Sequence, residues 1–248
     1  MFKPVVVIPV YNHGDAIGTV VAAVHAQGLV CILVDDGSGL ECAAVLQALA
    51  LRHADTVVLL RLPHNQGKGA AMVAGFRRAH VLGYTHALQI DADGQHQPSD
   101  IPVFLARSAR QPLAVVTGCP LFDASVPRTR LVARYATHIW VWINTLSLDI
   151  RDSMCGFRIY PLAAVVQLMD EVDIGRRMDF DTDVLVRLHW RGVAVVNQPT
   201  RVTYPLDGIS HFRLWLDNVL ITRMHTRLFF GMLLRSPQLL WRKLGSKP

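Results

Sequence analysis

The stretch LQIDADGQHQPSD (88–100) places two carboxylates and an amide directly after an apolar run that reads as the end of a buried strand. Residues two apart in an extended chain point to the same side, so Asp91, Asp93 and Gln95 would share one face if the chain stays extended beyond the strand. Oxygen ligands of this kind suit Mg²⁺ or Mn²⁺. The stretch therefore predicts a metal site, and the alternative is that Asp93 and Gly94 form a turn before a helix.

Further apolar runs of similar length alternate with helix-like segments through the first half of the chain. The expected strands span 4–10, 29–35, 56–62, 85–91 and 112–118. The expected helices span 15–27, 41–52, 67–83 and 99–110. This alternation predicts an α/β fold with a mostly parallel central sheet flanked by helices. The second half is less regular, with expected helices at 127–148, 161–170 and 180–191, a strand at 193–199 and a final amphipathic helix.

The composition limits the classes of protein. Hydrophobic residues make up 51% of the 248 residues, the net charge is +6, and the Lys and Arg residues after position 200 account for that excess. A basic end suits an anionic membrane surface, a phosphorylated substrate or nucleic acid. The four cysteines form no CxxC pair, which argues against a disulfide framework or zinc site and favours a reducing cytosol. We expect no signal peptide and no charge-free membrane span.

Polar residues gather where the expected strands end. The first two strands run into Tyr11 and Asn12 and into Asp35 and Asp36, and 88–100 supplies two more acids. Such ends meet at one edge of a parallel sheet, so the crowded acids require a positive charge, for which a divalent cation is one candidate. Because Mg²⁺ is usually held by one or two carboxylates together with substrate phosphates, the site predicts a phosphate-bearing ligand.

A glycine-flanked lysine follows the third expected strand in HNQGKGA (64–70). Its position at a helix start suggests that the backbone approaches an anion, with Lys68 as a point charge. The spacing is not that of a Walker loop. No GxGxxG follows the first strand, which argues against a dinucleotide-binding dehydrogenase.

Taken in order, five motifs resemble those of the inverting family 2 glycosyltransferases, and within them the polyprenyl-phosphate (dolichol-phosphate) mannosyl- and glucosyltransferase branch. The motifs are VVIPVYN (6–12), ILVDDGS (32–38), HNQGKGAAMVAGF (64–76), QIDADGQHQPSDI (89–101) and SMCGFRIYP (153–161). The resemblance covers roughly residues 4 to 212 and implies the GT-A nucleotide-diphospho-sugar transferase fold, with a DxD motif that holds Mg²⁺ or Mn²⁺.

The resemblance also implies roles for individual residues. The implied donor-binding residues are Pro9, Tyr11, Asn12, Asp35, Asp36, Lys68, Asp91, Ala92 and Asp93. The implied metal ligands are Asp91, Asp93 and Gln95. The residues implied for the acceptor phosphate are Arg128, Arg130, Arg158, Ser210 and His211. The implied catalytic residues are Asp93, Arg158, Asp181 and Asp183, the last two in a segment that the family usually writes with glutamates.

The implied reaction is metal-dependent hexose transfer from a GDP-mannose or UDP-glucose type of donor. Metal and Arg or Lys side chains would stabilise charge on the departing diphosphate. A phosphate acceptor is already ionised and needs no strong base, whereas a hydroxyl acceptor on another lipid or glycan needs a carboxylate. Asp181 or Asp183 would then serve, with Asp152 behind them.

Two apolar segments bear on localisation. The helix at 127–148 contains Trp140 and Trp142, which fit either core packing or a position at the bilayer surface. We expect one domain over 1–212 with a basic amphipathic extension over 213–248, and a cytoplasmic protein that is peripheral on the inner face of the membrane, held there by this extension or by a membrane-protein partner. Remote alternatives are a sugar-1-phosphate nucleotidyltransferase and a nucleic-acid-binding module. The first lacks its Gly-rich signature, and the second lacks interleaved basic and aromatic strands, so we expect no nucleic-acid partner.

Overall fold

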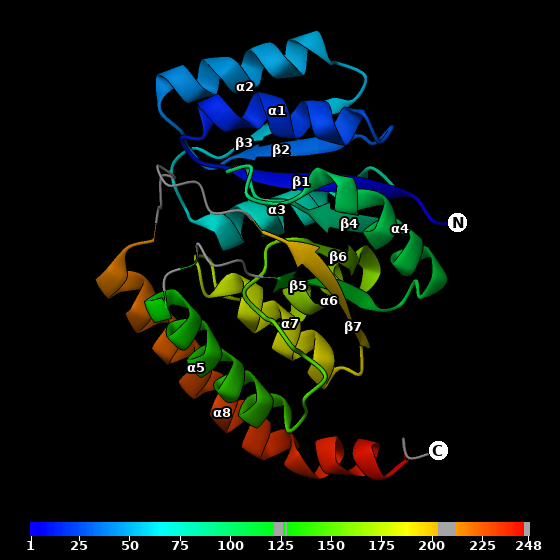
Figure 1. The fold of residues 1–248 in the computed structure, drawn as a ribbon, viewed down its shortest axis with the longest axis vertical. Coiled ribbons are helices and arrows are strands. Elements are labelled where there is room, and N and C mark those ends of the chain that lie inside the picture. Colours follow the sequence, from blue (N-terminus) through cyan, green and yellow to red (C-terminus); the bar gives the residue numbers. More distant parts are fainter. Residues whose placement is uncertain (122–125, 127, 203–211, 246–248) are drawn as a thin grey trace.

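The computed structural model describes residues 1–121, 126, 128–202 and 212–245 (Figure 1). A single 7-stranded sheet has the order β3-β2-β1-β4-β6-β5-β7. Its strands are β1 (Pro4–Val10), β2 (Cys31–Asp35), β3 (Val57–Arg61), β4 (His86–Gln89), β5 (Val115–Leu121), β6 (Arg158–Pro161) and β7 (Val195–Arg201). All pairings are parallel except those of β6, which is antiparallel to both neighbours. The expected mostly parallel α/β sheet is confirmed.

Helices cover both faces of this sheet. They are α1 (Gly14–His25), α2 (Leu40–Arg52), α3 (Lys68–Val81), α4 (Ile101–Arg110, preceded by the short 3₁₀ helix η1, Pro98–Asp100), α5 (Arg128–Thr145), α6 (Leu162–Glu171), α7 (Phe180–Trp190) and α8 (Leu214–Gly245). Each expected helix and strand has a counterpart, displaced by a few residues at the ends. The strand β6 was not expected, because the 151–161 segment was interpreted as a turn rather than as a strand.

Two hydrophobic cores lie on opposite faces, and the alternation along β1 explains why. Val6 and Ile8 pack with α1, α2 and α4, whereas Val5 and Val7 pack with α3, α6, α7 and α8. Successive side chains of a strand point to opposite faces, so a continuous apolar run supplies both cores. The direction of strand addition changes at β1, which lies between β2 and β4. Ligands of such sheets bind beyond the carboxyl ends of the strands at this switch.

The helices α5 and α8 lie side by side below the sheet in Figure 1 and pack on α7. The helix α8 is 32 residues long and continues through Pro237. Among the described residues, none of the helices combines the length and apolar character that a membrane crossing requires.

Candidate active site

The loops after β1 and β2 are joined by hydrogen bonds at the switch point. The backbone N–H of Gly39 donates to Asn12 Oδ1 at 2.8 Å, and the backbone N–H of Asn12 donates to Ser38 Oγ at 3.1 Å. Asn12 has a φ of +54°, which a side chain that bonds to local backbone can sustain. Pro9 lies near the end of the strand that leads into this loop. These loops give the proposed donor-binding residues a fixed arrangement.

The two acids at the end of β2 are both occupied by protein groups. Asp35 receives Arg61 Nε at 2.8 Å and the backbone N–H of Ser38 at 2.8 Å. Asp36 accepts hydrogen bonds from Asn65 Nδ2 and from the backbone N–H groups of Gln66 and Gly67. Burial raises the pKa of Asp36, and those N–H groups oppose the rise. Asp36 therefore supports the loop before α3, whereas Asp35 joins the end of β3 to the loop after β2. The roles of both acids toward a nucleotide stay predictions.

Lys68 lies between two carboxylates and is the cation that the acids of this edge share. Its Nζ is 2.8 Å from Asp91 Oδ1 and 2.8 Å from Asp181 Oδ2. Burial lowers the pKa of Lys68, but the charges of Asp181 and Asp91 outweigh burial and raise it above its ordinary value. For Asp91 the directions are opposite. Burial raises the pKa of its carboxyl group, but the charge of Lys68 outweighs burial and holds this pKa below its ordinary value. The crowding that the sequence indicated is thus partly relieved by the protein itself.

The segment after β4 turns rather than staying extended. Residues 92–94 form a turn, Gly94 has a φ of +71°, and Asp93 Oδ1 accepts the backbone N–H of Gln95 at 3.0 Å. The condition under which Asp91, Asp93 and Gln95 would share one face is therefore not met, because Asp93 and Gly94 close the turn that was the alternative. Burial and the nearby charge of Asp91 raise the pKa of Asp93. Among the described residues, Asp93 has no Lys or Arg at ion-pair distance.

Arg158 is fully buried, which corrects the expectation that it faces a phosphate. Every N–H of its guanidinium has a protein acceptor. These are the Thr117 and Tyr160 hydroxyls and the carbonyls of Ser153, Cys155 and Asp181. The side chain instead joins β5, β6, the 153–155 loop and the start of α7.

Asp183 and Asp152 are both buried and held in ion pairs. Asp183 is 0% exposed and contacts Arg187 Nε and Arg227 Nη2, both at 2.6 Å. Asp152 receives Arg134 Nε and Nη2 at 2.6 and 2.7 Å. The expectation that Asp183 acts as a base is therefore corrected, because its charge serves to join α7 to α8. Asp181, in contrast, faces Lys68 and accepts the Gln89 amide at 2.9 Å.

Two contributors to the site were missed in the sequence. His96 has its Nε2 3.6 Å from Asp91 Oδ2, and its ring stacks on Phe157. Gln89 is fully buried and holds Asp181. Two sequence features could have indicated them. Gln89 is an amide inside an otherwise apolar strand, and His96 is a histidine close to the two acids Asp91 and Asp93.

Gly156 explains why the 153–161 motif contains a glycine, because a Cβ there would collide with the Asp91 carboxylate. Four further predicted residues lie wholly or in part outside the description. Ser210 and His211 lie outside the described residues, and Arg128 and Arg130 are in α5 with side chains outside the description.

The chain is similar to known proteins over most of its length. Residues 5–165 match Glycosyl transferase family 2. Polyprenol monophosphomannose synthase of Mycolicibacterium smegmatis is 28% identical over 227 residues, which cover 84% of this chain and 80% of that protein. A dolichyl-phosphate beta-glucosyltransferase of Trichomonas vaginalis is 32% identical over 166 residues, covering 62% of this chain and 48% of that protein.

A solved structure extends the likeness to the fold. Glucosyl-3-phosphoglycerate synthase of Mycobacterium tuberculosis, in complex with Mn²⁺, UDP-glucose and phosphoglyceric acid, superposes with a TM-score of 0.63 at 15% identity. The superposition covers 94% of this chain and 79% of that one. The expected GT-A fold is thereby confirmed.

Proposed function

Because the chain belongs to glycosyl transferase family 2 and is a glycosyltransferase, we propose that it moves a hexose from a nucleotide-diphosphate sugar to a polyprenyl phosphate, inverting the anomeric carbon. The relatives named for polyprenol and dolichyl phosphate support a lipid-phosphate acceptor. Because the family that matches is a glycosyltransferase family, we do not retain the alternative of a sugar-1-phosphate nucleotidyltransferase. The comparisons give no support to the expected membrane-protein partner, and we do not propose one.

The observation that carries the choice of acceptor is the pairing of the α7 acids. Both oxygens of Asp183 contact arginines, and the two oxygens of Asp181 contact Lys68 and Gln89. A hydroxyl acceptor needs a carboxylate that is free to take its proton. A phosphate acceptor is ionised near neutral pH and needs none. The paired acids therefore favour the phosphate, and a hydroxyl acceptor, with Asp181 as its base, is the alternative.

Lys68 is the described cation best placed to stabilise the leaving group. Its side chain is only 17% exposed and places Nζ at the carboxyl edge of the sheet, and its raised pKa keeps the ammonium charged over the working pH range. As the sugar–phosphate bond breaks, negative charge grows on the diphosphate. A preorganised cation in a partly buried site stabilises such charge by several kcal/mol as an order of magnitude.

We also propose that the 91–95 turn takes a divalent cation, although the described residues bring no three His, Cys, Asp or Glu side chains together as a metal site. Asp93 is a partly buried carboxylate with a raised pKa and no basic partner among the described residues, so an ion would relieve its crowding with Asp91. Asp91, Asp93 and Gln95 would hold Mg²⁺ or Mn²⁺, and the ion when bound would supply positive charge to the diphosphate. The complex of the M. tuberculosis synthase contains Mn²⁺ with UDP-glucose, which supports this assignment.

The test is a donor and acceptor panel. Purified protein with Mn²⁺ is incubated with GDP-mannose, UDP-glucose and related donors, with and without polyprenyl phosphate, and released nucleoside diphosphate and glycolipid are measured. We expect release from one donor that depends on polyprenyl phosphate. Transfer to a lipid or glycan hydroxyl, with polyprenyl phosphate inert, would establish the alternative.

A matched pair of variants tests the metal site. Asp93→Asn should reduce turnover by about 10³-fold or more, because it weakens charge stabilisation in the transition state. Asp55→Asn changes an exposed acid between α2 and β3, at the opposite edge of the sheet, and should leave turnover unchanged. Full turnover in Asp93→Asn would remove this carboxylate from the proposed chemistry.

A further inference from the structure

The helix α8 is apolar on two opposite faces, and only one of them is covered. Met224, Leu228, Met232 and Leu239 face the core and are between 0 and 4% exposed. The opposite face carries large apolar side chains spaced at helical intervals. They are Trp215 (84% exposed), Val219 (47%), Phe230 (61%), Leu234 (83%), Trp241 (77%) and Leu244 (70%). A helix at the surface of a water-soluble protein normally has one apolar stripe, so the second requires a partner.

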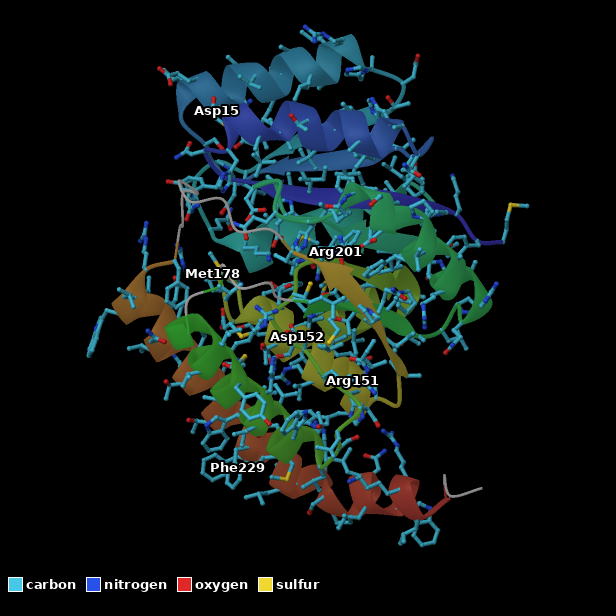
Figure 2. All side chains as sticks on the ribbon, viewed as in Figure 1. Asp15, Arg151, Asp152, Met178, Arg201 and Phe229 are labelled. Atoms are coloured by element: carbon cyan, nitrogen blue, oxygen red, sulfur yellow. The ribbon has the colours of Figure 1, made fainter. Side chains whose placement is uncertain are left out.

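Side chains of α5 extend this second stripe sideways. Trp140 is 45% exposed and packs edge-on against Phe229, with ring centroids 6.3 Å apart, and Phe229 in turn contacts Phe230 at 5.9 Å. Figure 2 shows Phe229 on α8 beside α5. Ile139 is also exposed on α5, at 43%. We call the exposed apolar side chains of α8 and these α5 residues the outer face.

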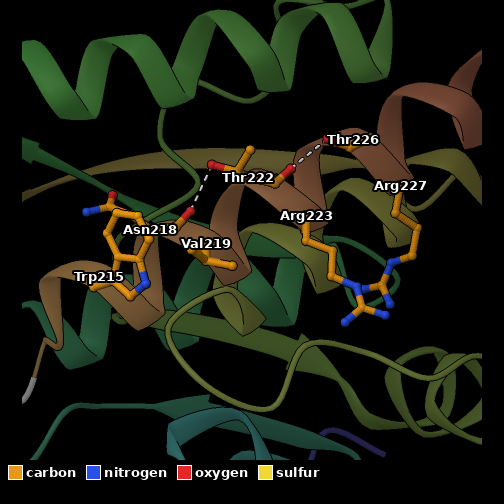
Figure 3. A pocket seen from close by; sticks show the side chains of 7 residues that line it. All are labelled: Trp215, Asn218, Val219, Thr222, Arg223, Thr226 and Arg227. Atoms are coloured by element: carbon orange, nitrogen blue, oxygen red, sulfur yellow. Dashed lines mark hydrogen bonds between the residues drawn. The ribbon is translucent and has the colours of Figure 1, made fainter.

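The two helices that form the outer face, α5 and α8, expose no acid. The sequence of α5 contains no Asp or Glu, and the single acid of α8, Asp217, is 1% exposed. A shallow pocket of about 790 Å³ on α8 combines Trp215 and Val219 with Arg223 and Arg227 (Figure 3). Arg223 is exposed and has no ion pair among the described residues. An apolar surface with arginines and without exposed acids complements an anionic one.

We propose that the outer face lies on an anionic lipid bilayer, with α8 parallel to the membrane plane. A helix of 32 residues is about 48 Å long, and its apolar stripe would enter the boundary between headgroups and acyl chains along this length. Trp215 and Trp241, near the two ends, would sit at headgroup depth. A second copy of the chain is a poorer occupant, because two outer faces would bring like charges together.

This inference deepens the proposed function, on which its biological meaning rests, because a polyprenyl phosphate is presented by a bilayer. Arg227 of α8 contacts Asp183, which lies two residues from Asp181 in the candidate active site. A membrane in contact with α8 would therefore be connected to the candidate active site through α7, which contacts α8 at Asp183 and Lys68 at Asp181.

Vesicle flotation with the full chain tests the surface. Vesicles of phosphatidylcholine alone are compared with vesicles that contain phosphatidylglycerol as well, and only the latter should bind the protein strongly. Phe230→Glu combined with Leu234→Glu should weaken binding by about tenfold or more, because charge replaces two apolar side chains that would enter the bilayer. The matched control, Leu51→Glu with Leu113→Glu, alters equally exposed side chains elsewhere and makes the same change in net charge.

The outcomes separate the surface from the reaction. Unchanged binding in the α8 pair, or equal loss in the control pair, would overturn the inference. Self-association that the α8 pair abolishes, without vesicle binding, would overturn it in favour of a second copy. If the α8 pair unfolds, Trp215→Ser with Trp241→Ser replaces it. Transfer to a short, water-soluble prenyl phosphate reads out the proposed function separately, and the α8 pair should leave that rate unchanged.

Discussion

Two carboxylates of α7, only two residues apart, end in different surroundings. Asp181, whose own side chain is 8% exposed, faces the carboxyl edge of the sheet, where it shares Lys68 with the 24% exposed side chain of Asp91. Asp183 faces α8, where it is 0% exposed between Arg187 and Arg227. Residues two apart on a helix point to nearly opposite sides, so Asp181 faces the proposed active site and Asp183 packs against α8. We call Lys68 with its two acids the open network, because Asp91 is partly exposed, and Asp183 with its two arginines the closed network. Only the open network has a carboxylate that a ligand could reach.

Removing Lys68 should have the largest effect on this comparison. In Lys68→Met, Asp91 and Asp181 lose the cation between them, and we expect the free energy of unfolding to fall by about 4 kcal/mol at about pH 8. Burial and mutual repulsion would raise the pKa of one carboxylate above its unfolded value. Part of the lost stability should therefore return as the pH falls toward about 5, where that carboxylate takes up a proton.

Urea unfolding at the two pH values measures this change, with Lys68→Arg as the control that keeps the charge. Equal stability of Lys68→Met and the wild type at both pH values would show that the open network contributes nothing to folding.

Opening the closed network should have the next largest effect. Asp183→Asn leaves Arg187 and Arg227 without their buried counter-ion, and we expect a loss of about 3 kcal/mol. Unlike Lys68→Met, this variant should gain no stability on acidification. Urea unfolding is again the measurement, and Asp173→Asn, at an 82% exposed side chain, is the control. A variant as stable as the wild type would mean that the arginines are already solvated.

The interface of α5 and α8 should add a pH dependence of its own. Burial lowers the pKa of His225 to about 4. In the unfolded chain the histidine has an ordinary pKa near 6.5. Between about pH 6.5 and pH 4 the unfolded chain therefore binds a proton that the folded protein does not bind, so the free energy of unfolding falls as the pH drops.

Between about pH 7 and pH 5 the loss should be about 2 kcal/mol. His225→Gln has no proton to bind, and its unfolding free energy should vary less over the same range. Identical pH profiles of the two proteins would assign the dependence to other groups.

The smallest effect should come from an ion pair of the same length at the surface. Arg77 Nη2 lies 2.8 Å from Asp170, as Lys68 does from Asp91, but the side chains are 51 and 58% exposed. Asp170→Asn should change the unfolding free energy by less than about 1 kcal/mol. A loss as large as that of Asp183→Asn would show that distance rather than burial sets these energies.

Local patterns were sufficient to predict the sheet, the helices on both faces and the edge where the polar residues meet. Runs such as 4–10 are apolar at every position, which suits a strand with helices above and below. The spacing of Lys68 from its strand placed it at a helix start, where α3 begins. The family motifs also contain Lys68 and Asp91, which the structure brings into contact at this edge.

What could not be predicted depends on partners distant in sequence. The family resemblance implied that Arg158 faces a phosphate, and only the meeting of β5, β6 and α7 supplies the acceptors that bury it. The strand β6 is four residues long and pairs antiparallel between strands from elsewhere, so no local period reveals it. Lys68 was expected near the nucleotide, and its contacts with Asp91 and Asp181 were not predicted, because a sequence does not tell which lysine reaches which acid.

The contact of Arg227 with Asp183 also decides where this chain can be cut. Ending the polypeptide before residue 213 looks harmless in the sequence, since the family match stops at 165. Such a truncation would strip Met224 and Leu228 from the core and leave the Asp183 charge half-neutralised inside the protein. Shortened versions made for crystallisation or assay should therefore retain the last helix, and those that omit it should be recovered as aggregates rather than as a smaller enzyme.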